Sequence, residues 1–537
     1  LRRTRSFASP RFYPSLYSTS HSSSLKTRNF AHGRAKVSEK MRTSDEKHEA
    51  GMMDENFVEA TDKPHSHVAS TGDAAMTRRI LLKLDFRIVP VLALLFLCSF
   101  LDRTNVGNAK TYGLETDLKM FDADDRRYDT GLAVYYATYI ASEIPSNLVL
   151  KKISPKIWLP ALTIMWGIVT MCLGFVRNYA GFVAVRAILG ITEGGLLPGI
   201  VLYLSGMYTR GEMALRLGLF YTAASLSGAF GGLLARGLSA IGRVGPQASW
   251  SWIFIIEGLL TVVVGVVSYF LLPNSVETAG FLSAEEQVHA RSRLHLDMPS
   301  RLAQDGSEHQ HEAFQWSEVL RGVLDLSTWL SAASYFGILA GLYSFGLFLP
   351  TIIVELGYTA NEAQLWSVIP YAVASVVTVI VAIVSDRLKL RGIIMLFVLI
   401  PAIIGYAVIA NIGIQHPKVK YGMTFLMATG MYASVPCVLV WNSNNSAGHY
   451  KRATTTALQL MIANSGGFVA TFIYPSNDKP QYHKGHTVIL GLLVFSWFMA
   501  ALNVLNCWRI NKAKANGKYD KYTGYADDRD PEFLMVL

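Results

Sequence analysis

Cysteine and charge are both scarce in this sequence. Its four cysteines, Cys98, Cys172, Cys437 and Cys507, all lie in apolar stretches, and none belongs to a CxxC pair. This spacing predicts neither a thiolate metal site nor a disulfide framework. Charged residues make up only 16% of the 537 residues, against about 25% in a typical soluble domain. Because 51% of the chain is hydrophobic, the composition predicts a protein embedded in a lipid bilayer.

The net charge of +10 does not indicate a nucleic-acid-binding protein. Residues 1–40 hold nine basic side chains and one acid, Glu39, which account for +8 of that charge. The rest of the chain has too little excess positive charge to build a groove for phosphates. The Ser- and Arg-rich start fits either an organellar transit segment or a disordered cytoplasmic tail. Since the chain begins at Leu1, we expect a fragment or a translated upstream region, with Met41 and Met52 as candidate starts.

Twelve apolar segments are long enough to cross a membrane. A crossing takes about 20 apolar residues in a helix, because the backbone must satisfy its own hydrogen bonds there. The predicted spans are 88–108, 131–150, 157–176, 179–202, 216–241 and 250–272 in the first half and 328–350, 362–384, 392–411, 421–441, 453–475 and 486–508 in the second. The sequence therefore predicts an all-α membrane protein of two six-helix halves.

The domain boundaries follow from these spans. We expect a disordered cytoplasmic tail at 1–74, a first bundle at 75–272, a cytoplasmic linker at 273–325, a second bundle at 326–508 and a cytoplasmic tail at 509–537. Within the linker, the pattern from Ser283 to Glu286 predicts the start of a surface helix. Basic residues in the short loops place both termini in the cytoplasm. We expect a monomer in the plasma membrane.

Glycines recur at four-residue spacing in the fourth predicted span. Gly190 and Gly194 form one such pair, and Gly195 and Gly199 form another. Small residues at this spacing let helix backbones approach closely in lipid. We expect these glycines to serve packing rather than ligand binding.

Ionisable residues inside the predicted spans carry the most information about function. A charge there costs about 2.5–3.5 kcal/mol on insertion scales, so it persists mainly beside a partner, a wet cavity or a substrate path. The first span contains Asp102 and Arg103, and the fourth contains Arg186 and Glu193. The helical rise places the two arginines at one depth, with Glu193 two turns from Arg186 on the same face. We predict that the four side chains meet in one chamber.

Two interpretations of these four charges remain open. Two guanidinium groups at one depth can bind a carboxylate bidentately, and two nearby acids can carry protons. Alternatively, Asp102 pairs with Arg186, or Glu193 with a neighbour, only to neutralise a buried charge. Other membrane charges are less specific. We expect Arg236 and Glu257 to form a structural salt bridge between neighbouring helices, whereas Glu143 is either a gate contact or structural.

Several motifs along the chain resemble those of a known transporter family. They are LDRTNVGNAK in the first span, YYATYIASEIPSNLVLKK in the second, RAILGITEGGLLPG in the fourth, WSWIFIIEG in the sixth, and WNSNNSAGHYKRATTTAL between the tenth and eleventh. Their order resembles the anion:cation symporter family of the major facilitator superfamily, and most closely its fungal allantoate permease branch. The resemblance covers residues 75 to 515. It implies two pseudo-symmetric halves that rock about a central site.

The resemblance also implies a substrate and roles for particular residues. Members of the family import carboxylates such as allantoate, nicotinate or pantothenate together with protons. By this analogy Arg103 and Arg186 hold the substrate carboxylate, and Asp102 and Glu193 are the protonatable pair. Tyr139 lines the cavity in the first half. The candidate polar contacts from the second half are Tyr343, Asn442, Asn444 and Asn445.

The superfamily's inner-loop gating motif, GxxxDRxGRR, is only partly present. In the second half SDRLKLRG supplies Asp386, Arg387 and Arg391 but lacks the central glycine. In the first half the corresponding loop has lysines and no Asp-Arg pair. The resemblance therefore leaves open which ion pairs close the cytoplasmic side.

The sequence as a whole predicts a secondary active transporter that imports a small organic anion by proton symport. Two other functions remain possible, a pH-independent facilitator for a neutral solute and a non-transporting nutrient sensor. We do not expect an enzyme, because the sequence has no metal-ligand cluster, no GxSxG nucleophile motif and no GxxxxGK[ST] phosphate loop. No cofactor is expected.

Overall fold

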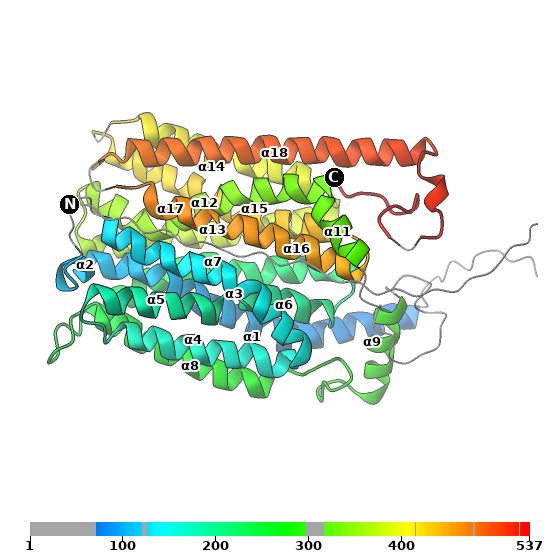
Figure 1. The fold of residues 1–537 in the computed structure, drawn as a ribbon, viewed down its shortest axis with the longest axis horizontal. Coiled ribbons are helices and arrows are strands. Elements are labelled where there is room, and N and C mark those ends of the chain that lie inside the picture. Colours follow the sequence, from blue (N-terminus) through cyan, green and yellow to red (C-terminus); the bar gives the residue numbers. More distant parts are fainter. Residues whose placement is uncertain are drawn as a thin grey trace, which may run out of the picture. The chain divides into compact units, whose positions relative to one another are not determined.

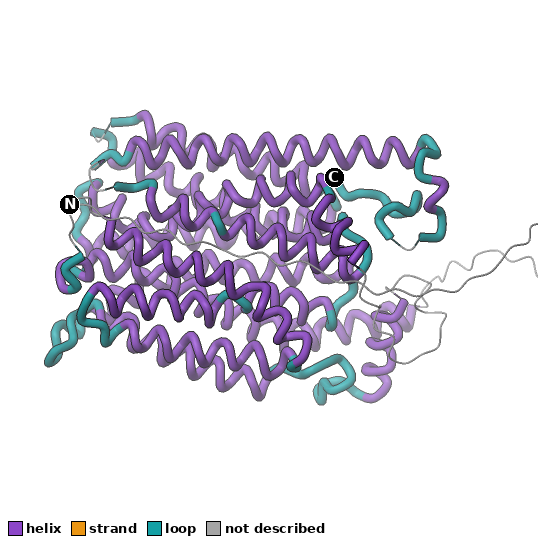
Figure 2. Tube along the Cα trace, in the orientation of Figure 1, coloured by secondary structure: helices purple, strands orange, loops and turns teal. Residues whose placement is uncertain are grey.

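The computed structural model shows a bundle of long helices (Figure 1). It describes residues 71–120, 126–296, 316–413, 415–475, 478, 480–525 and 527–537, and no β-strand occurs among them (Figure 2). The chain divides into two units, Leu1–His67 and Val68–Leu537, and all the described residues belong to the second. The predictions for residues 1–40 and for most of the tail 1–74 lie outside the described residues.

The first half is built from helices α1 to α8. Their bounds are α1 Thr71–Thr111, α2 Leu114–Asp117, α3 Arg126–Lys152, α4 Pro155–Leu173, α5 Tyr179–Glu193, α6 Leu196–Ser205, α7 Arg210–Ser239 and α8 Ser251–Leu271. The fourth predicted span is thus two helices, because α5 ends at Glu193 and α6 begins after Gly195.

The linker and the second half contribute the remaining helices. Their bounds are α9 Ala284–Leu296, α11 Trp316–Leu324, α12 Leu326–Glu355, α13 Ala360–Leu388, α14 Arg391–Asn411, α15 Pro417–Asn444, α16 His449–Asn464, α17 Gly466–Phe472, α18 His483–Ala515 and the short η2 Asp520–Tyr522. In the linker, α9 begins as the sequence predicts. The backbone N–H of Glu286 donates to Ser283 Oγ, and the Ser283 N–H donates to the Glu286 carboxylate.

Ten helical segments among the described residues are long and apolar enough to cross a membrane. The predicted spans 131–150 and 453–475 are helical as well, but they fall outside that set. The first lies in α3, which carries several charged residues, and the second is divided between α16 and α17.

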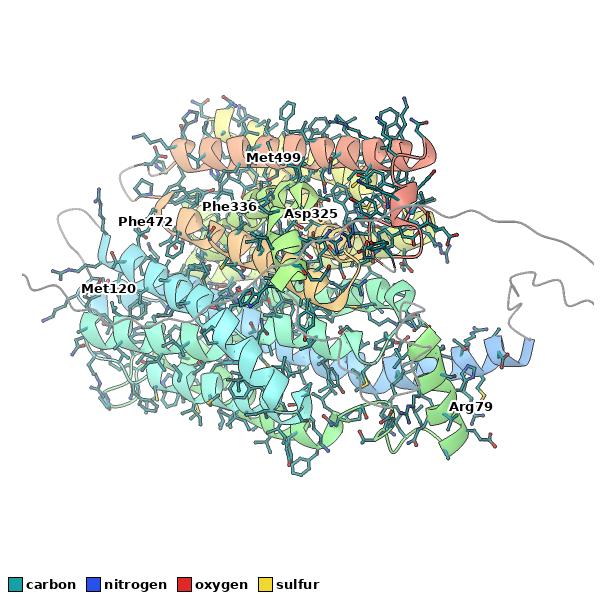
Figure 3. All side chains as sticks on the ribbon, turned by 45° about the vertical axis from the view of Figure 1, so that its right-hand side comes forward. Arg79, Met120, Asp325, Phe336, Phe472 and Met499 are labelled. Carbon is teal, nitrogen blue, oxygen red and sulfur yellow. The ribbon has the colours of Figure 1, made fainter. Side chains whose placement is uncertain are left out.

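Helix α1 begins at Thr71, well before the predicted span at 88. The extra turns bury Ile80 and Leu84 completely, and Lys83 donates a 2.6 Å hydrogen bond to the Glu286 carboxylate on α9. Figure 3 shows Arg79 on this projecting end of α1, beside α9. Lys83 and the Ser283 N–H lower the pKa of the Glu286 carboxyl group below its ordinary value. Hydropathy missed these turns because tertiary contacts with α9, rather than lipid, stabilise them.

Within each half, neighbouring helices pack in pairs. In the first half α4 packs on α8, α3 on α5 and α1 on α7; in the second, α14 packs on α15 and α12 on α18. The halves meet mainly through α7 against α13 and through α1 against α12. Glycines make the α7–α13 contact close, since Gly228 lies against the Tyr371 ring and Gly232 against the Gln364 backbone.

The C-terminal segment folds back onto one end of the second half. The Lys514 ammonium donates hydrogen bonds to the backbone carbonyls of Asp528, Asp530 and Phe533. The Trp441 indole N–H on α15 donates to the Val536 carbonyl at 2.7 Å. The segment after α18 is therefore part of the packed structure of this half.

Candidate functional site

A buried ion pair between α1 and α5 lies at the centre of the candidate site. Arg103 Nη2 donates to Glu193 Oε1 at 2.7 Å. The same oxygen accepts from Ser99 Oγ at 2.6 Å, and Glu193 Oε2 accepts from the Tyr135 hydroxyl at 2.7 Å. Both charged side chains are buried. The carboxylate thus receives three hydrogen bonds, which stabilise its ionised form where water is excluded.

Glycines on α5 bring this helix against the tyrosine face of α3. A Cβ at Gly190 would strike Thr138 and the Tyr135 backbone, and a Cβ at Gly194 would strike Ser142 and the Tyr139 carbonyl. The small residues predicted to serve packing therefore do pack at this interface. The glycines also help to form the site, because the close approach of the two helices places the α3 tyrosines beside the charges of α5.

Arg186 is the buried cation of the site that forms no ion pair with any residue the structure describes. Its side chain is 1% exposed, and Nε and Nη1 have no hydrogen-bond partner among the described residues. The guanidinium carbon lies 4.5 Å from the centroid of the Tyr135 ring, and that of Arg103 lies 5.6 Å from the same ring. Both arginines therefore lie around one aromatic side chain, as their predicted common depth requires. Cation–π contact stabilises the Arg186 charge only in part.

The second half reaches this site through two polar side chains. Arg103 Nη1 donates to the Tyr343 hydroxyl on α12 at 3.0 Å, and that hydroxyl donates to Asn464 Oδ1 on α16 at 2.7 Å. Tyr139, the predicted cavity residue of α3, has its ring 4.9 Å from the Arg103 guanidinium carbon. The structure thus places Tyr139, predicted to line the cavity, and Tyr343, predicted as a polar contact, beside Arg103.

Sequence reasoning missed three residues of the site: Ser99, Tyr135 and Asn464. Two of them had a signal, since Ser99 precedes Arg103 by four residues on α1 and Tyr135 precedes Tyr139 by four on α3. Residues at this spacing share a helix face. Asn464 had no such signal, because only the packing of α16 against α12 brings it to Tyr343.

Glu143 lies two turns beyond Tyr136 on α3, a helix of the first half that contacts the second half. Its side chain is buried, and neither carboxylate oxygen has a hydrogen-bond partner among the described residues. Helix α3 contacts α16 and α17 of the second half. Glu143 forms no ion pair within the part of the chain that the structure describes, so its role as a gate contact and its structural role both remain predictions.

Asp102 does not join its neighbour Arg103 in the central site. Its Oδ2 accepts hydrogen bonds from the Trp166 indole N–H on α4 at 3.0 Å and from Thr261 Oγ1 on α8 at 3.1 Å. No ion pair links it to Arg186 among the described residues. Successive residues on a helix point about 100° apart, which turns Asp102 into the first half while Arg103 faces the central site. The prediction that all four charges meet in one chamber therefore fails for Asp102.

The predicted salt bridge between Arg236 and Glu257 is wrong. Glu257 is buried and accepts a short hydrogen bond from the Asn105 side chain on α1, whereas Arg236 is exposed near the end of α7. Similar depth on neighbouring helices did not suffice, because the two side chains project in different directions. Glu257 instead faces α1.

The asparagines predicted near α15 lie outside the site. Asn442 donates to Gln459 Oε1 at 3.2 Å within the second half. Asn445 is bonded to the C-terminal segment, since its Nδ2 donates to the Val536 carbonyl and its Oδ1 accepts from the Val536 N–H. Asn444 is half-buried at the end of α15. The prediction of a substrate contact is therefore contradicted for Asn445, whose amide holds the chain's own backbone.

The gating-motif residues form a local pair. Arg391 Nη2 donates to Asp386 Oδ1 at 2.7 Å, and Arg391 Nη1 donates to Ser385 Oγ at 3.2 Å. Arg387 is exposed at the end of α13. The pair joins the end of α13 to the start of α14, and thus lies within one half.

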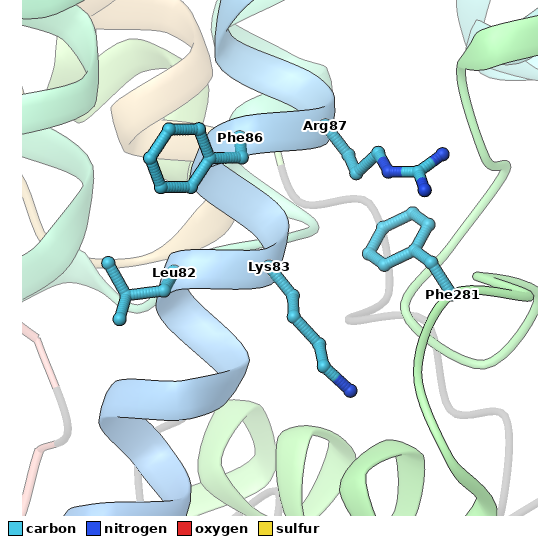
Figure 4. Close-up of a pocket in the computed structure, with 5 residues that line it drawn as sticks. All are labelled: Leu82, Lys83, Phe86, Arg87 and Phe281. Carbon is cyan, nitrogen blue, oxygen red and sulfur yellow. The ribbon is translucent and has the colours of Figure 1, made fainter.

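A hollow of about 310 Å³ lies on the projecting part of α1 (Figure 4). It is lined by Leu82, Lys83, Phe86, Arg87 and Phe281, and the Arg87 guanidinium carbon lies 5.9 Å from the centroid of the Phe281 ring. Arg87 precedes Arg103 by sixteen residues on one helix, or about 24 Å. This open surface feature is therefore separate from the central site.

The fold and the buried charges belong to a transporter family. The sequence profile of the Major Facilitator Superfamily matches residues 92–471. The chain belongs to this superfamily. Its family, its relatives and its fold are those of membrane transporters and not of enzymes.

Two fungal relatives are similar over most of their length. An uncharacterized transporter of Schizosaccharomyces pombe is 36% identical over 464 residues, covering 85% of this chain and 90% of the relative. The high-affinity nicotinic acid transporter of Saccharomyces cerevisiae is 32% identical over 471 residues, covering 86% and 85%. Both similarities place this superfamily member among fungal transporters.

A solved bacterial structure shares the fold. It is a bacterial homologue of the human lysosomal transporter Spinster in an inward-facing and unoccupied conformation, with a TM-score of 0.56 and 15% identity over 78% of this chain and 95% of the other. At this identity the similarity supports the major facilitator fold alone.

Proposed function

We propose that this transporter imports a small organic anion by proton symport with alternating access. The substrate class is a carboxylate such as allantoate, nicotinate, pantothenate or a related acid. The 32% identity to a nicotinic acid transporter supports an organic acid as substrate. We further propose a monomer in the plasma membrane with both termini in the cytoplasm.

The Arg186 guanidinium is the observation that carries the proposal. A buried charge without hydrogen-bond partners is costly, and its cost falls when an oppositely charged group binds to it. A carboxylate matches the guanidinium fork with two parallel hydrogen bonds, which a neutral solute cannot do as well. The Nε and Nη1 groups of Arg186, which have no partner among the described residues, could thus donate to an anion bound beside Tyr135.

The Arg103–Glu193 pair supplies a means of coupling to protons. Protonation of Glu193 would neutralise the partner of Arg103 and leave this second guanidinium available to the substrate. Loss of the proton on the other side of the membrane would restore the pair and favour release of the anion. Tyr343 and Asn464 would transmit the change at Arg103 to the second half, since they extend the same hydrogen-bond chain.

The number of protons sets the driving force. One proton with a monoanion is electroneutral, and a pH gradient then supplies about 1.4 kcal/mol, or tenfold accumulation, per pH unit. A second proton makes transport electrogenic, so that the membrane potential adds about 2.3 kcal/mol per 100 mV.

Uptake by a host that lacks its own carriers tests the proposal. Cells expressing the chain are given a panel of radiolabelled carboxylates at two external pH values. We expect at least one acid to accumulate more at the lower pH, and a protonophore to abolish the accumulation. Uptake of a neutral solute at a rate that does not depend on external pH would support a facilitator instead. A chain that reaches the membrane and moves none of these solutes would contradict the proposal.

A further inference from the structure

We infer that Glu257, which lies near Asp102 in the interface between α1 and α8, binds a proton of its own, whereas for Asp102 a proton-carrying role is already implied by the family resemblance. The inference rests on the proposed function, because it adds a second coupling proton to it. The site is separate from the Arg103–Glu193 pair, which lies on a different face of α1. Below, this interface of Asp102, Asn105, Glu257 and Thr261 is called the α1–α8 seam.

Two hydrogen bonds across the helices define the seam. Thr261 Oγ1 donates to Asp102 Oδ2, and Asn105 Nδ2 donates to Glu257 Oε2. The α1 residues are three apart and the α8 residues four apart, so each pair lies on one face of its helix. The two carboxyl groups are thus about one helical turn apart along a single interface.

In each carboxyl group of the seam, one oxygen accepts a hydrogen bond and the other has no hydrogen-bond partner among the described residues. Asp102 Oδ1 and Glu257 Oε1 are buried and have no hydrogen-bond partner among the described residues. The same is true of Thr170 Oγ1 on α4, one turn from Trp166, whose indole N–H binds Asp102. A buried carboxylate oxygen without a donor is costly when ionised. A carboxylic acid removes that charge, and its O–H can donate to an oxygen such as that of Thr170.

The bonded groups fit a proton better than a metal ion. The side chains that meet the carboxyl groups of Asp102 and Glu257 present hydrogen-bond donors: the Trp166 indole N–H, the Thr261 hydroxyl and the Asn105 amide N–H. The Asn105 carbonyl oxygen is already engaged by Asn108 Nδ2 at 3.3 Å. A sodium or calcium site needs several convergent oxygens, and here the partnerless oxygens of Asp102 and Glu257 belong to carboxyl groups about one helical turn apart.

Outside the seam, the Glu193 carboxylate at the end of α5 interacts electrostatically with Asp102, and its own ionic partner is Arg103. Helix α8 packs against α1, α4 and α7. On α4 the charged residue is Lys156, ten residues before Trp166. On α7, Arg216 is paired with Asp85 and Arg236 is exposed. The further titratable group on the seam side of α1 is Cys98, one turn before Asp102 and buried, while Arg103 is paired with Glu193.

Helix α1 connects the seam to the substrate site. Asp102 and Arg103 are consecutive residues on it, so any rotation or tilt of α1 that follows proton uptake in the seam also moves the Arg103 guanidinium. Asn105 and Asn108 continue the polar face of α1 toward its end at Thr111.

Infrared difference spectroscopy on the purified full chain without substrate tests the inference. Spectra taken between about pH 5 and about pH 9, a range that covers raised carboxyl pKa values, should contain C=O bands of buried carboxylic acids. We expect Glu257→Gln to remove one band and Asp102→Asn to remove another. Glu532→Gln, at an exposed position near the C-terminus, should leave the spectrum unchanged. An unaltered spectrum in Glu257→Gln would overturn the inference.

Two further measurements keep the result interpretable. Thr170→Val removes a hydroxyl without removing a carboxyl group, so it should shift a band and not abolish it; a spectrum that does not change would contradict the proposed acceptor. Replacing potassium by sodium at constant pH should change nothing. Loss of the band on adding sodium would show a sodium site and overturn the proton assignment.

Transport then separates this inference from the proposed function. If two protons are coupled, Glu257→Gln should lower the accumulation of a transported acid about tenfold per unit of pH gradient. If Glu257→Gln loses its infrared band but the unaltered chain transports no acid, the proton site in the seam is supported and the proposed function is contradicted. If Glu257→Gln transports the acid with an unchanged number of protons, the proposed function is supported and the coupling role of Glu257 is contradicted.

Discussion

The two halves of the bundle share an architecture but differ in where they place charge. In the first half, Asp102, Arg103, Glu143, Arg186 and Glu257 are buried within helices, and Glu193 is buried at the junction of α5 and α6. In the second half, the buried charged residues of the described chain lie near helix ends; they are Arg391, Lys420, Lys451, His486 and Lys514. At the central site the described residues of the second half that bond to Arg103 or extend its hydrogen-bond chain are neutral, namely Tyr343 and Asn464.

This difference suggests that the two halves have different roles in transport. A charge in the middle of a membrane helix must be neutralised, paired or bound to a ligand, and so it responds strongly to a proton or an anion. A tyrosine or an amide keeps the same charge throughout. We therefore propose that the first half senses substrate and protons, while the second half follows through hydrogen bonds. The following predictions test that division.

The largest effect is expected from Arg186→Lys. An ammonium is a point charge and cannot replace the planar fork, and hydrogen bonds to charged groups contribute roughly 1.5–3 kcal/mol each. Loss of two such bonds should weaken uptake of the transported acid by at least about 100-fold. The control is Arg236→Lys, an arginine on α7 that is exposed. Normal saturation by the acid in Arg186→Lys would remove this residue from the substrate site.

A smaller but more specific effect is expected from Glu193→Gln. The substituted side chain cannot exchange a proton, so net uptake driven by a pH gradient should be lost. Exchange of internal for external substrate should remain, because it requires no net proton movement. Glu285→Gln, an exposed change on α9, is the matched control. Unchanged net uptake down a pH gradient would assign the coupling to other groups, with the α1–α8 seam as the next candidate.

A more modest effect is expected when the second half loses its contact with Arg103. Tyr343→Phe removes the hydroxyl that accepts from Arg103 and donates to Asn464. At about 0.5–1.5 kcal/mol for each hydrogen bond, affinity for the acid should fall roughly tenfold, while the pH dependence is retained. Tyr406→Phe is the control, since that buried hydroxyl of α14 has no partner among the described residues. If Tyr343→Phe also abolished pH dependence, the division between halves would be wrong.

The smallest effect concerns stability rather than transport chemistry. Gly194→Ala would place a methyl group against the Tyr139 carbonyl and Ser142, forcing α5 and α3 apart. Overpacking of this kind costs about 1–3 kcal/mol, so we expect a lower melting temperature in detergent, measured by gel filtration after heating. Gly491→Ala on α18 meets nothing within 4 Å and should not lower it. Equal stability of the two variants would show that α5 does not depend on this glycine.

Much of the fold could be predicted from the sequence because hydropathy acts locally. Apolar runs such as Ser251–Leu271 and Arg391–Asn411 coincide closely with the predicted spans. The turns of α1 before residue 88 could not be predicted in this way, since they depend on a distant partner, Glu286. The break in the helix after Glu193 was also missed, because the sequence pattern of Gly194 and Gly195 is as compatible with one continuous, closely packed helix as with a break.

The central site could be predicted in part. Arg103, Arg186 and Glu193 were identifiable because charge is expensive in lipid wherever it occurs. Asp102 and Glu257 were identifiable by the same argument, yet Asp102 lies outside the chamber predicted for it and Glu257 does not pair with Arg236. Depth along a helix can be counted from sequence, whereas the direction in which a side chain projects depends on how neighbouring helices are rotated.

The sequence by itself determined that this chain is a multi-helix membrane transporter and which buried charges matter, because the cost of burying charge and the length of a membrane crossing are properties of single segments. Only the tertiary structure decided the pairings: Arg103 with Glu193 and Tyr343, Asp102 with Trp166 and Thr261, and Glu257 with Asn105. The reason is physical. A hydrogen bond between two helices depends on their relative rotation and height to within about an ångström, and those quantities are set by the packing of the whole bundle.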